Sequence, residues 1–388
     1  MKRVLVLGGK LQGVEAAYLM KKAGWHVTVA DRNPECAAAR LGDTFLKLDF
    51  LKCGELRSAI AGADFVIPAL EKLHVLEKIT EAARDCNVPL MFNLASFRIS
   101  RSKLCSDKLF AKICIPAPQP WPDCKPPFIV KPSGRSGSEG VRFLATAAEF
   151  DEWQQATVSR ADWVVQEYLC GPSYSIEIIA KKGELKTFQV TELEMDRRHD
   201  CKRVICPSLL PRKKELEFAA IAQKLAKAVE LEGIMDVEVI LHDNRLKVLE
   251  IDARLPSQTL TAVYNSTGII APAVYAEGFG SGEATEFTQI NGCGVIYEHI
   301  EVRGRRLRTA GEHIMGGHGP LRWVENFFGA DEALTTYEPG KDSWVATLIM
   351  KDVDRTAVWA KHEQVMRNIM QANGLRDYED YGLEEMEL

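Results

Sequence analysis

The chain has 388 residues, of which 27% are charged, and a formal net charge of −5 at pH 7. This length allows two or three domains, and the slightly acidic balance argues against a general nucleic-acid-binding protein, which is usually basic. Every apolar run is shorter than the ~18–20 residues of a membrane span. We therefore expect no membrane partner and a cytoplasmic location.

The ten cysteines are scattered along the chain and include no C-x-x-C pair. Cys201 and Cys206 lie closest in sequence, and their separation is a poor match to the spacing of zinc ligands. We expect reduced thiols, as is usual in the cytoplasm, and no structural zinc.

The N-terminal segment has the pattern of a β-α-β unit, with strand, helix and strand at residues 2–8, 12–22 and 26–30. Asp31 follows the second strand, where an acid can bind the ribose of a dinucleotide. However, Lys10 occupies the position where the G-x-G-x-x-G fingerprint needs its second glycine, which disfavours NAD. The unit is expected to bind another ligand at its strand ends, with Lys10 and Gln12 as candidate cofactor contacts, or only to pack.

The same alternation continues with a strand, an amphipathic helix and a further strand at residues 64–68, 70–86 and 89–93. One α/β domain therefore closes near residue 95. Glu71 lies at the carboxyl end of the first of these strands and is a candidate ligand-binding residue. An acid that only favours the dipole of the helix start is the alternative.

A basic helical segment at residues 102–112 and a proline-rich linker lead to a strand at residues 128–131 that ends in Lys131. A loop of Ser and Gly from Ser133 to Gly140 follows, and a strand resumes at residue 141. Backbone N–H groups in such a loop can point at a phosphate, and glycine allows positive φ. A mobile turn would have the same composition. The loop lacks the Walker pattern and precedes a strand, which excludes P-loop chemistry.

The rest of the chain is expected to be an α+β body that closes with a helix at residues 355–371 and an acidic tail that frays from Asp377. Further elements are expected at residues 150–156, 163–168, 174–180, 215–229, 264–275, 295–302 and 344–350.

The stretch from Gly233 to Gln258 is expected to form a hairpin, with strands at 235–241 and 246–251. Because side chains alternate between the two faces of a strand, folding at the turn brings Glu238 opposite Glu250.

Asp236 and Asp252 belong to the same set of acids, and carboxylates that converge on an apolar hairpin repel one another. Mg²⁺, which prefers oxygen ligands and phosphate, would relieve that repulsion. A solvated strand face with ordinary acids is the alternative. Arg254, two residues after the last acid, favours an anion site.

In this order the segments resemble the ATP-grasp superfamily of carboxylate–amine ligases over nearly the whole chain. The resemblance implies an α/β (α+β) fold with three parts: a Rossmann-like domain at residues 1–95, a lid domain at 96–180, and a C-terminal domain at 181–388 that carries the metal site. It implies ATP and two Mg²⁺ as cofactors.

The resemblance also implies roles for individual residues. Glu238, Glu250 and Asp252 match the metal positions, with Asp252 where Asn is commoner, and Arg254 matches the arginine that stabilises the reacting group. Nucleotide contacts are implied for the phosphate lysines Lys103 and Lys131, the loop residue Ser138, the adenine-hinge residues Gln166, Glu167 and Leu169, and Glu177, which would replace a ribose-binding Glu that is Ser173 here.

Within the superfamily, the segments FRISRSK, GIMDVEVI and EIDARLPSQT are similar to the ligases of pyrrolysine biosynthesis. That branch activates 3-methyl-D-ornithine as an acyl phosphate and joins it to the ε-amine of L-lysine. The alternatives are a ligase that makes a D-alanyl dipeptide, one that carboxylates a purine intermediate, and a non-catalytic nucleotide-binding regulator.

Both substrates of that branch are cationic diamino acids, so we expect acidic side chains to recognise their amines. The candidate substrate residues are Glu71, Asp200, Asp236, Glu298, Arg254, Ser257 and Gln258. His199 and His299 are candidate proton acceptors, although a polar packing role is favoured for both. The oligomeric state is left open, with a homodimer as one option.

Overall fold

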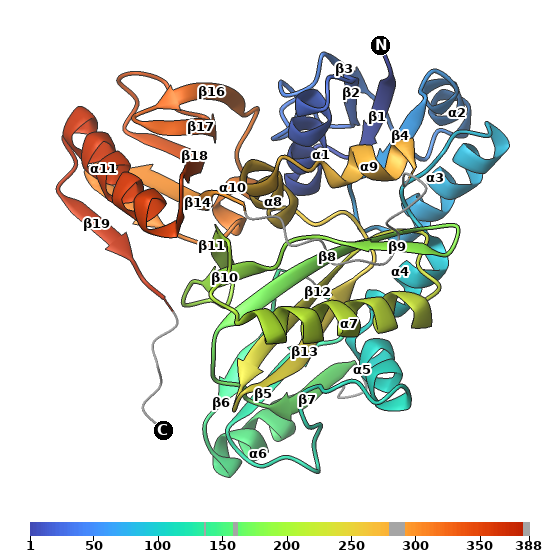
Figure 1. Ribbon diagram of the computed structural model, residues 1–388, viewed down its shortest axis with the longest axis vertical. Coiled ribbons are helices and arrows are strands. Elements are labelled where there is room, and N and C mark those ends of the chain that lie inside the picture. Colours follow the sequence, from blue (N-terminus) through green and yellow to red (C-terminus); the bar gives the residue numbers. More distant parts are fainter. Residues whose placement is uncertain (136, 158–161, 279–291, 383–388) are drawn as a thin grey trace.

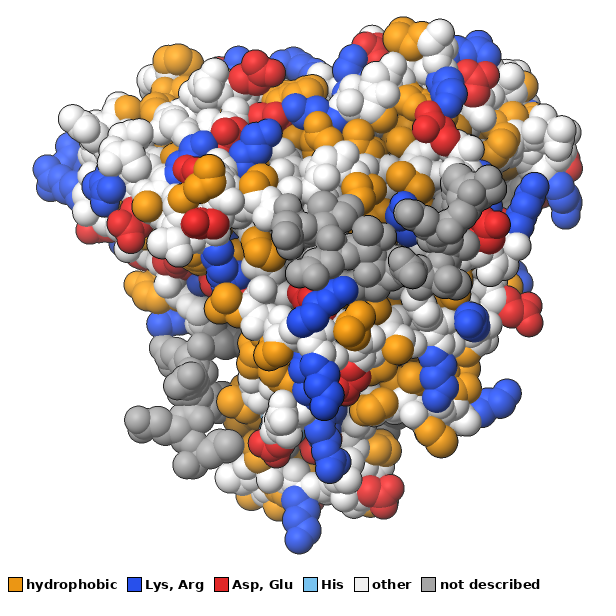
Figure 2. Space-filling view, viewed as in Figure 1, with side chains coloured by type: hydrophobic (Ala, Val, Ile, Leu, Met, Phe, Trp, Pro, Cys, Tyr) orange, Lys and Arg blue, Asp and Glu red, His pale blue; other side chains and the backbone are white. Residues whose placement is uncertain are grey.

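The computed structural model describes residues 1–388 except 136, 158–161, 279–291 and 383–388. Figure 1 shows the N-terminal α/β domain beside the strands of the C-terminal part, with a smaller sheet and its helix at the opposite end of the molecule. Acidic and basic side chains lie on the same face of the molecule with hydrophobic ones between them (Figure 2).

The N-terminal domain is a parallel sheet of order β3-β2-β1-β4 with helices packed against it. Its elements are β1 (Arg3–Leu7), α1 (Leu11–Lys22), β2 (His26–Asp31), β3 (Thr44–Lys47), α2 (Cys53–Ala61), β4 (Phe65–Pro68) and α3 (Leu73–Asp85). The predicted β-α-β unit is confirmed, since β1 and β2 pair in parallel. The strand predicted at residues 89–93 is wrong, because one bridge at Leu90 precedes a helix capped by Asn93.

A smaller antiparallel sheet of order β6-β5-β7 lies in the part of the chain that was predicted to be the lid, and that name is kept for it below. The elements of this region are α4 (Leu94–Ser100), α5 (Lys103–Lys112), β5 (Phe128–Pro132), β6 (Arg142–Leu144), α6 (Ala147–Ala156) and β7 (Trp163–Glu167). Phe150 and Trp153 of α6 pack on Phe128 and Val130 of β5, which gives the lid a core of its own.

The third part is a sheet of twelve strands with the order β13-β12-β8-β10-β11-β14-β18-β17-β16, to which β9, β15 and β19 attach. The strands are β8 (Ser173–Lys181), β9 (Glu184–Thr187), β10 (Thr191–Met195), β11 (Cys201–Cys206), β12 (Gly233–His242), β13 (Arg245–Asp252), β14 (Gly294–Arg303), β15 (Arg306–Thr309), β16 (Arg322–Phe327), β17 (Ala330–Thr335), β18 (Ser343–Asp352) and β19 (Asp377–Asp380). The helices are α7 (Arg212–Ala228), α8 (Thr259–Thr267), α9 (Ala271–Glu277), α10 (His313–Gly316) and α11 (Arg355–Asn373).

The pairing of β8 indicates where the lid ends. The division of the chain into domains remains a proposal. β8 is hydrogen-bonded to β12 of the large sheet and not to the lid. We therefore favour a lid that ends before Ser173 over the boundary expected at residue 180.

The β12–β13 hairpin has the expected register, with Glu238 opposite Glu250. Asp243 and Asn244 turn the chain with φ values of 47° and 60°, the conformation that a two-residue hairpin turn requires. A bulge beside Glu238 shifts the register, so Val248 and Ile251 both pack in the apolar core beneath the sheet. Glu250 therefore stays on the opposite face.

The two faces of this part of the sheet differ in chemistry. Met235, Val237 and Val239 pack with Phe218 of α7 in one apolar core. Because side chains alternate along the strand, Asp236 and Glu238 point to the other face. Figure 1 shows α7 lying along the sheet over β12 and β8. The helix covers one face of the sheet, and the acidic face is turned toward the rest of the molecule.

The end of the chain departs from the expected frayed tail. Asp377–Asp380 form β19, which pairs in parallel with β15, so fraying from Asp377 is wrong for these four residues. Residues 383–388 of the tail lie outside the described residues. All ten cysteines are free thiols. Among the described residues, every helix is too short or too polar to cross a membrane.

Candidate functional site

Two cavities meet at the acidic face of the hairpin. The larger, of about 590 Å³, lies against the N-terminal domain. The smaller, of about 130 Å³, is lined by Asp236, Glu238, Glu250 and Asp252. The residues that line both cavities are Gly137, Arg254, Ser257 and Glu312. The structure thus brings together residues from the lid loop, from the segment after β13 and from the loop before α10.

Three of the hairpin carboxyl groups hold their protons more tightly than free carboxyl groups do. Burial and the neighbouring charges of Glu250 and Asp252 raise the pKa of Glu238 to about 8. Burial also raises the pKa of Asp252 to about 7 and that of Asp236 well above its ordinary value. Like charges that are buried together disfavour ionisation. The positive charge around this cluster is therefore too small to offset its burial.

Three cations border the cluster. Lys103 Nζ lies 2.8 Å from Glu250 Oε1. Arg254 pairs with Asp252 at 2.9 Å and with Glu71 at 3.0 Å, and so connects the hairpin to the N-terminal domain. Lys131 is buried at 5% exposure, and burial lowers the pKa of its ammonium. A buried ammonium in this state is stabilised by an anion.

The Ser/Gly loop of the lid lies over the acidic face. Ser138 donates a hydrogen bond of 2.5 Å to the His199 carbonyl oxygen, which belongs to the loop between β10 and β11. Lys103 Nζ donates to the Arg135 carbonyl oxygen at 2.9 Å. Ser138 and Gly137 have φ values of 56° and 61°, which agrees with the expected need for glycine in this loop. Residue 136 lies outside the described residues.

The predicted hinge residues lie where β7 leaves the lid. Gln166 and Leu169 are buried. The Glu167 carboxylate accepts a hydrogen bond from the Gln119 N–H at 2.8 Å and pairs with Lys247 of β13. The hinge is thereby connected to the strand that carries Glu250.

Lys10, Gln12 and Glu71 line the larger cavity. Gln12 donates to Glu71 at 3.0 Å. The predicted phosphate and hinge residues do not line this cavity, whose described wall comes mainly from the N-terminal domain. The placement favours a substrate contact for Lys10 and Gln12 over the predicted nucleotide contact.

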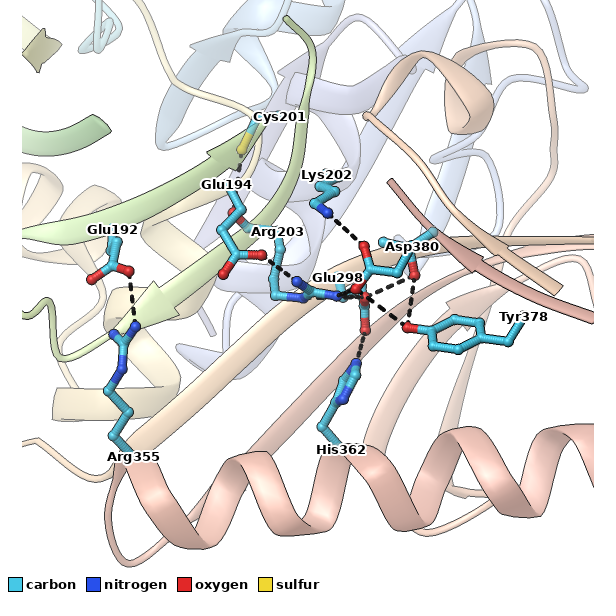
Figure 3. Close-up of polar contacts among 11 residues, drawn as sticks. Glu192, Glu194, Cys201, Lys202, Arg203, Glu298, Arg355, His362, Tyr378 and Asp380 are labelled. Atoms are coloured by element: carbon cyan, nitrogen blue, oxygen red, sulfur yellow. Dashed lines mark hydrogen bonds and ion pairs between the residues drawn. The ribbon is translucent and has the colours of Figure 1, made fainter. Parts of the chain in front are cut away.

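Glu298 does not fit its predicted role in amine recognition. It is fully buried and is bound by Arg203 and His362 (Figure 3). It also lies on the other face of the sheet. Its partner in register is Arg203, the neighbour of Val204, and Val204 packs toward the N-terminal domain. The Asp200 carboxylate, although beside the smaller cavity, already accepts from the His313 N–H at 3.0 Å.

Two further predicted roles find no support in the placement. Glu177 is fully buried and accepts from Ser175 at 3.0 Å, and its burial closes it off from a ribose. His299 is buried against Thr347, and burial lowers the pKa of its imidazole to about 3. The polar packing role favoured for His299 fits this environment. Burial also lowers the pKa of His199, which borders the smaller cavity.

Glu312 is a further residue of the site, which no sequence pattern indicated. It lies in the loop between β15 and α10, and its Oε2 accepts from Ser257 Oγ at 2.6 Å and from Gln258 Nε2 at 3.0 Å. Burial raises the pKa of its carboxyl. A single acid after an expected strand carries no spacing signal, so only the folded chain reveals its place.

Comparison with known proteins agrees with this architecture. Residues 69–258 match the ATP-grasp domain family. The biotin carboxylase domain of Hydrogenobacter thermophilus 2-oxoglutarate carboxylase, in complex with MgADP, superposes with a TM-score of 0.71 at 14% identity over 94% of this chain and 89% of that one. Staphylococcus aureus N5-carboxyaminoimidazole synthetase, complexed with ADP, gives 0.67 at 15% identity over 94% and 97%. At these identities the two structures establish the fold alone.

Sequence relatives establish more. The 3-methyl-D-ornithine–L-lysine ligase of Methanosarcina acetivorans is 36% identical over 352 residues, which are 88% of this chain and 94% of that protein. The ligase of the same name from Methanosarcina mazei is 36% identical over 77% and 78%. Fold and relatives define an ATP-dependent carboxylate–amine ligase of the ATP-grasp class. The chain belongs to the 3-methyl-D-ornithine–L-lysine ligase family.

Proposed function

We propose that this ligase activates the carboxylate of 3-methyl-D-ornithine as an acyl phosphate and joins it to the ε-amine of L-lysine, with release of ADP and phosphate. The observation that carries the proposal is the meeting of the hairpin carboxylates with two cations: Lys103, which pairs with Glu250, and Arg254, which lines both cavities. Relatives that match most of the chain bear this ligase name. We further propose a cytoplasmic location, which suits ten free thiols, and a homodimer.

The residues present fit Mg²⁺ and ATP. The cluster of Glu238, Glu250 and Asp252 lacks positive charge, as the raised pKa values of Glu238 and Asp252 indicate, and carboxylate oxygens are the ligands that Mg²⁺ takes. Lys131 needs more negative charge around it, because burial lowers the pKa of its ammonium group. A metal-bound polyphosphate satisfies both needs at once.

In this proposal Glu238, Glu250 and Asp252 hold two Mg²⁺, and Lys103 and Lys131 hold the phosphates. The hinge residues Gln166, Glu167 and Leu169 hold the adenine. Bound Mg²⁺ neutralises the charge that develops on the phosphoryl oxygens.

The protein supplies positioning and electrostatic stabilisation at the reacting carboxylate. Arg254 holds that carboxylate and then the oxyanion of the tetrahedral intermediate. The loop around Ser138 closes over the junction and excludes water, which would otherwise hydrolyse the acyl phosphate. The ε-amine, with an ordinary pKa of ~10.4, loses a proton before it attacks. The phosphate then leaves, and the amide remains.

The test is ATP-dependent phosphate release with mass detection of the product, from L-lysine plus D-ornithine or its 3-methyl derivative. We expect a product at the summed mass minus water, linked through the lysine side chain. D-Alanine and an aminoimidazole ribonucleotide serve as controls for the alternative ATP-grasp ligases. Release with a control substrate alone would contradict the substrate assignment and keep the ATP-grasp class.

A further inference from the structure

Among the described residues, Glu312 is the only carboxylate that lines both cavities. Arg254 also lines both. Ser257 and Gln258, which follow Arg254 in the chain, both donate to its Oε2. Arg254 and Glu312 thus face the same junction from two different segments, one cationic and one anionic.

The fold fixes Glu312 in this place through its backbone. The Glu312 N–H donates to the Cys201 carbonyl oxygen of β11 at 3.1 Å. The neighbouring Gly311 N–H donates to Asp196 at 3.0 Å, and a Cβ on Gly311 would lie 2.3 Å from the Asp200 carboxylate. The segment therefore packs too closely on the loop between β10 and β11 to admit a side chain at residue 311, and Glu312 is held toward the junction.

Glu312 forms no ion pair with any of the described residues, although the nearby charge of Arg254 favours its ionised form. Its two hydrogen bonds come from the neutral groups of Ser257 and Gln258, and both use Oε2. A buried carboxylate without a counter-charge is costly, so a cationic ligand at this point would stabilise it.

Gln258 supplies a second, independent indication of a ligand. It is 6% exposed and lines the smaller cavity. Its Nε2 is used by Glu312, but its Oε1 is a buried acceptor to which the described residues provide no donor. An ammonium group carries three donors and no acceptor, so it can satisfy Oε1 of Gln258 and neutralise Glu312 together.

An amino acid presents its ammonium group one carbon away from its carboxylate, and the junction presents Arg254 beside Glu312. On the basis of the function proposed above, we propose that Glu312, assisted by Gln258, binds the α-ammonium group of the amino acid whose carboxylate is activated at Arg254. Glu312 then acts as a specificity-determining residue that selects an α-amino acid over a simple carboxylic acid.

The test compares D-ornithine with 5-aminopentanoic acid, which is the same molecule without the α-amino group. ADP formation is measured at saturating ATP and L-lysine. The wild-type protein should prefer D-ornithine in kcat/KM by roughly ten- to a hundredfold, the usual worth of a hydrogen bond to a charged group. Glu312→Gln keeps the acceptor for Ser257 but removes the charge. Glu312→Gln should remove most of the preference for D-ornithine by raising the KM for D-ornithine, while the KM for ATP stays unchanged.

Glu35→Gln is the matched control, because Glu35 is an exposed acid of the N-terminal domain that lines neither cavity. It should keep the full preference. The unfolding temperature of each variant reports whether it folds. If Glu312→Gln does not fold, Glu312→Asp, which keeps the charge on a shorter side chain, should show an intermediate preference.

Three outcomes would overturn the inference. These are equal use of the two acids by the wild-type protein, an unchanged preference in the folded Glu312 variant, and a rise in the KM for L-lysine alone, which would assign Glu312 to the attacking amine. Failure of the proposed function has a different signature, since the wild-type protein would then form no product from D-ornithine and L-lysine.

Discussion

Two clusters of buried charge lie on opposite faces of the same sheet and behave in opposite ways. The hairpin cluster consists of the acids Glu238, Glu250 and Asp252, and burial raises the pKa of Glu238 to about 8. In the second cluster, centred on Arg203 and Glu298 (Figure 3), burial alone would also raise the pKa of Glu298. There the charges of Arg203 and His362 outweigh burial and lower that pKa to about 2.

The comparison separates a structural cluster from a functional one. The Arg203 cluster is complete in itself: Arg203 pairs with Glu298, Glu194 and Asp380, and Lys202 pairs with Asp380. Each of these charged groups has a partner of opposite charge within the cluster, without any ligand. The hairpin cluster lines the smaller cavity and has too little positive charge around it. Perturbed carboxylates beside a cavity indicate a binding site, whereas perturbed carboxylates in a closed ion-pair network indicate a structural role.

The largest effect is expected for Glu238→Gln. The substitution removes a proposed metal ligand, so turnover should fall by about 10²–10³-fold. The unfolding temperature of the metal-free protein should stay the same or rise, because one charge leaves a repelling cluster. Glu238 is a better choice than Glu250, because replacement of Glu250 would leave Lys103 without its ion-pair partner. A Glu238→Gln protein that unfolds would make the hairpin cluster structural.

The opposite result is expected for Arg203→Met. This change leaves Glu298 buried without its main counter-charge and should destabilise the protein by about 3–5 kcal/mol in denaturant unfolding. The folded protein should keep its KM values, since Arg203 lies away from both cavities. In the matched double variant Arg203→Met/Glu298→Gln, the loss should be smaller than the sum of the single losses. Additive losses would contradict a direct pair.

The pH dependence of stability should also have opposite signs for the two clusters. Glu298 has a lowered pKa, so it contributes stability that is full above about pH 4.5 and is lost as the pH falls toward 2. Glu238 has a raised pKa, so its contribution is full below about pH 4.5 and is lost as the pH rises through 8.

Thermal unfolding of metal-free protein from pH 5 to 8 tests the second half of this statement. Between pH 5 and pH 8, the unfolding temperature of Glu238→Gln should rise relative to that of the wild type by on the order of 2 °C or more. Parallel curves for the two proteins would contradict the raised pKa of Glu238.

The smallest effect is expected for Asp380→Asn in β19. Asp380 is partly exposed and pairs with Lys202 and Arg203, so its loss should cost roughly 1 kcal/mol. Hydrogen exchange of the β19 amides should accelerate while turnover stays unchanged. Unchanged exchange would mean that backbone pairing with β15 alone holds this strand.

The sequence predicted local features well where pattern and turn chemistry coincide. The hairpin register, with Glu238 opposite Glu250, follows from side-chain alternation and the Asp243-Asn244 turn. The strand expected at residues 89–93 was wrong, because a short apolar run does not show that only Leu90 finds a partner. Tertiary pairing, which no local pattern encodes, also orders β19.

The same limit applies to the site. Arg254 and the hairpin acids follow from one continuous segment, and the structure brings them together as expected. Glu298 and Glu312 show what sequence alone could not decide. Glu298 lies in β14, and Glu312 lies in the loop after β15. Only the pairing of β14 with β11 turns Glu298 away from the cavities. A hydrogen bond to Cys201 holds Glu312 at the junction.

The measurement that tests the central claim most directly is the unfolding temperature of metal-free protein with and without MgADP at pH 8. If the hairpin cluster is a binding site that lacks positive charge, MgADP should raise the unfolding temperature of the wild type and of Arg203→Met. The rise should be lost in Glu238→Gln. A ligand at a hundred times its Kd adds about 2.7 kcal/mol, which corresponds to several degrees. No rise in the wild type, or an equal rise in Glu238→Gln, would contradict the account.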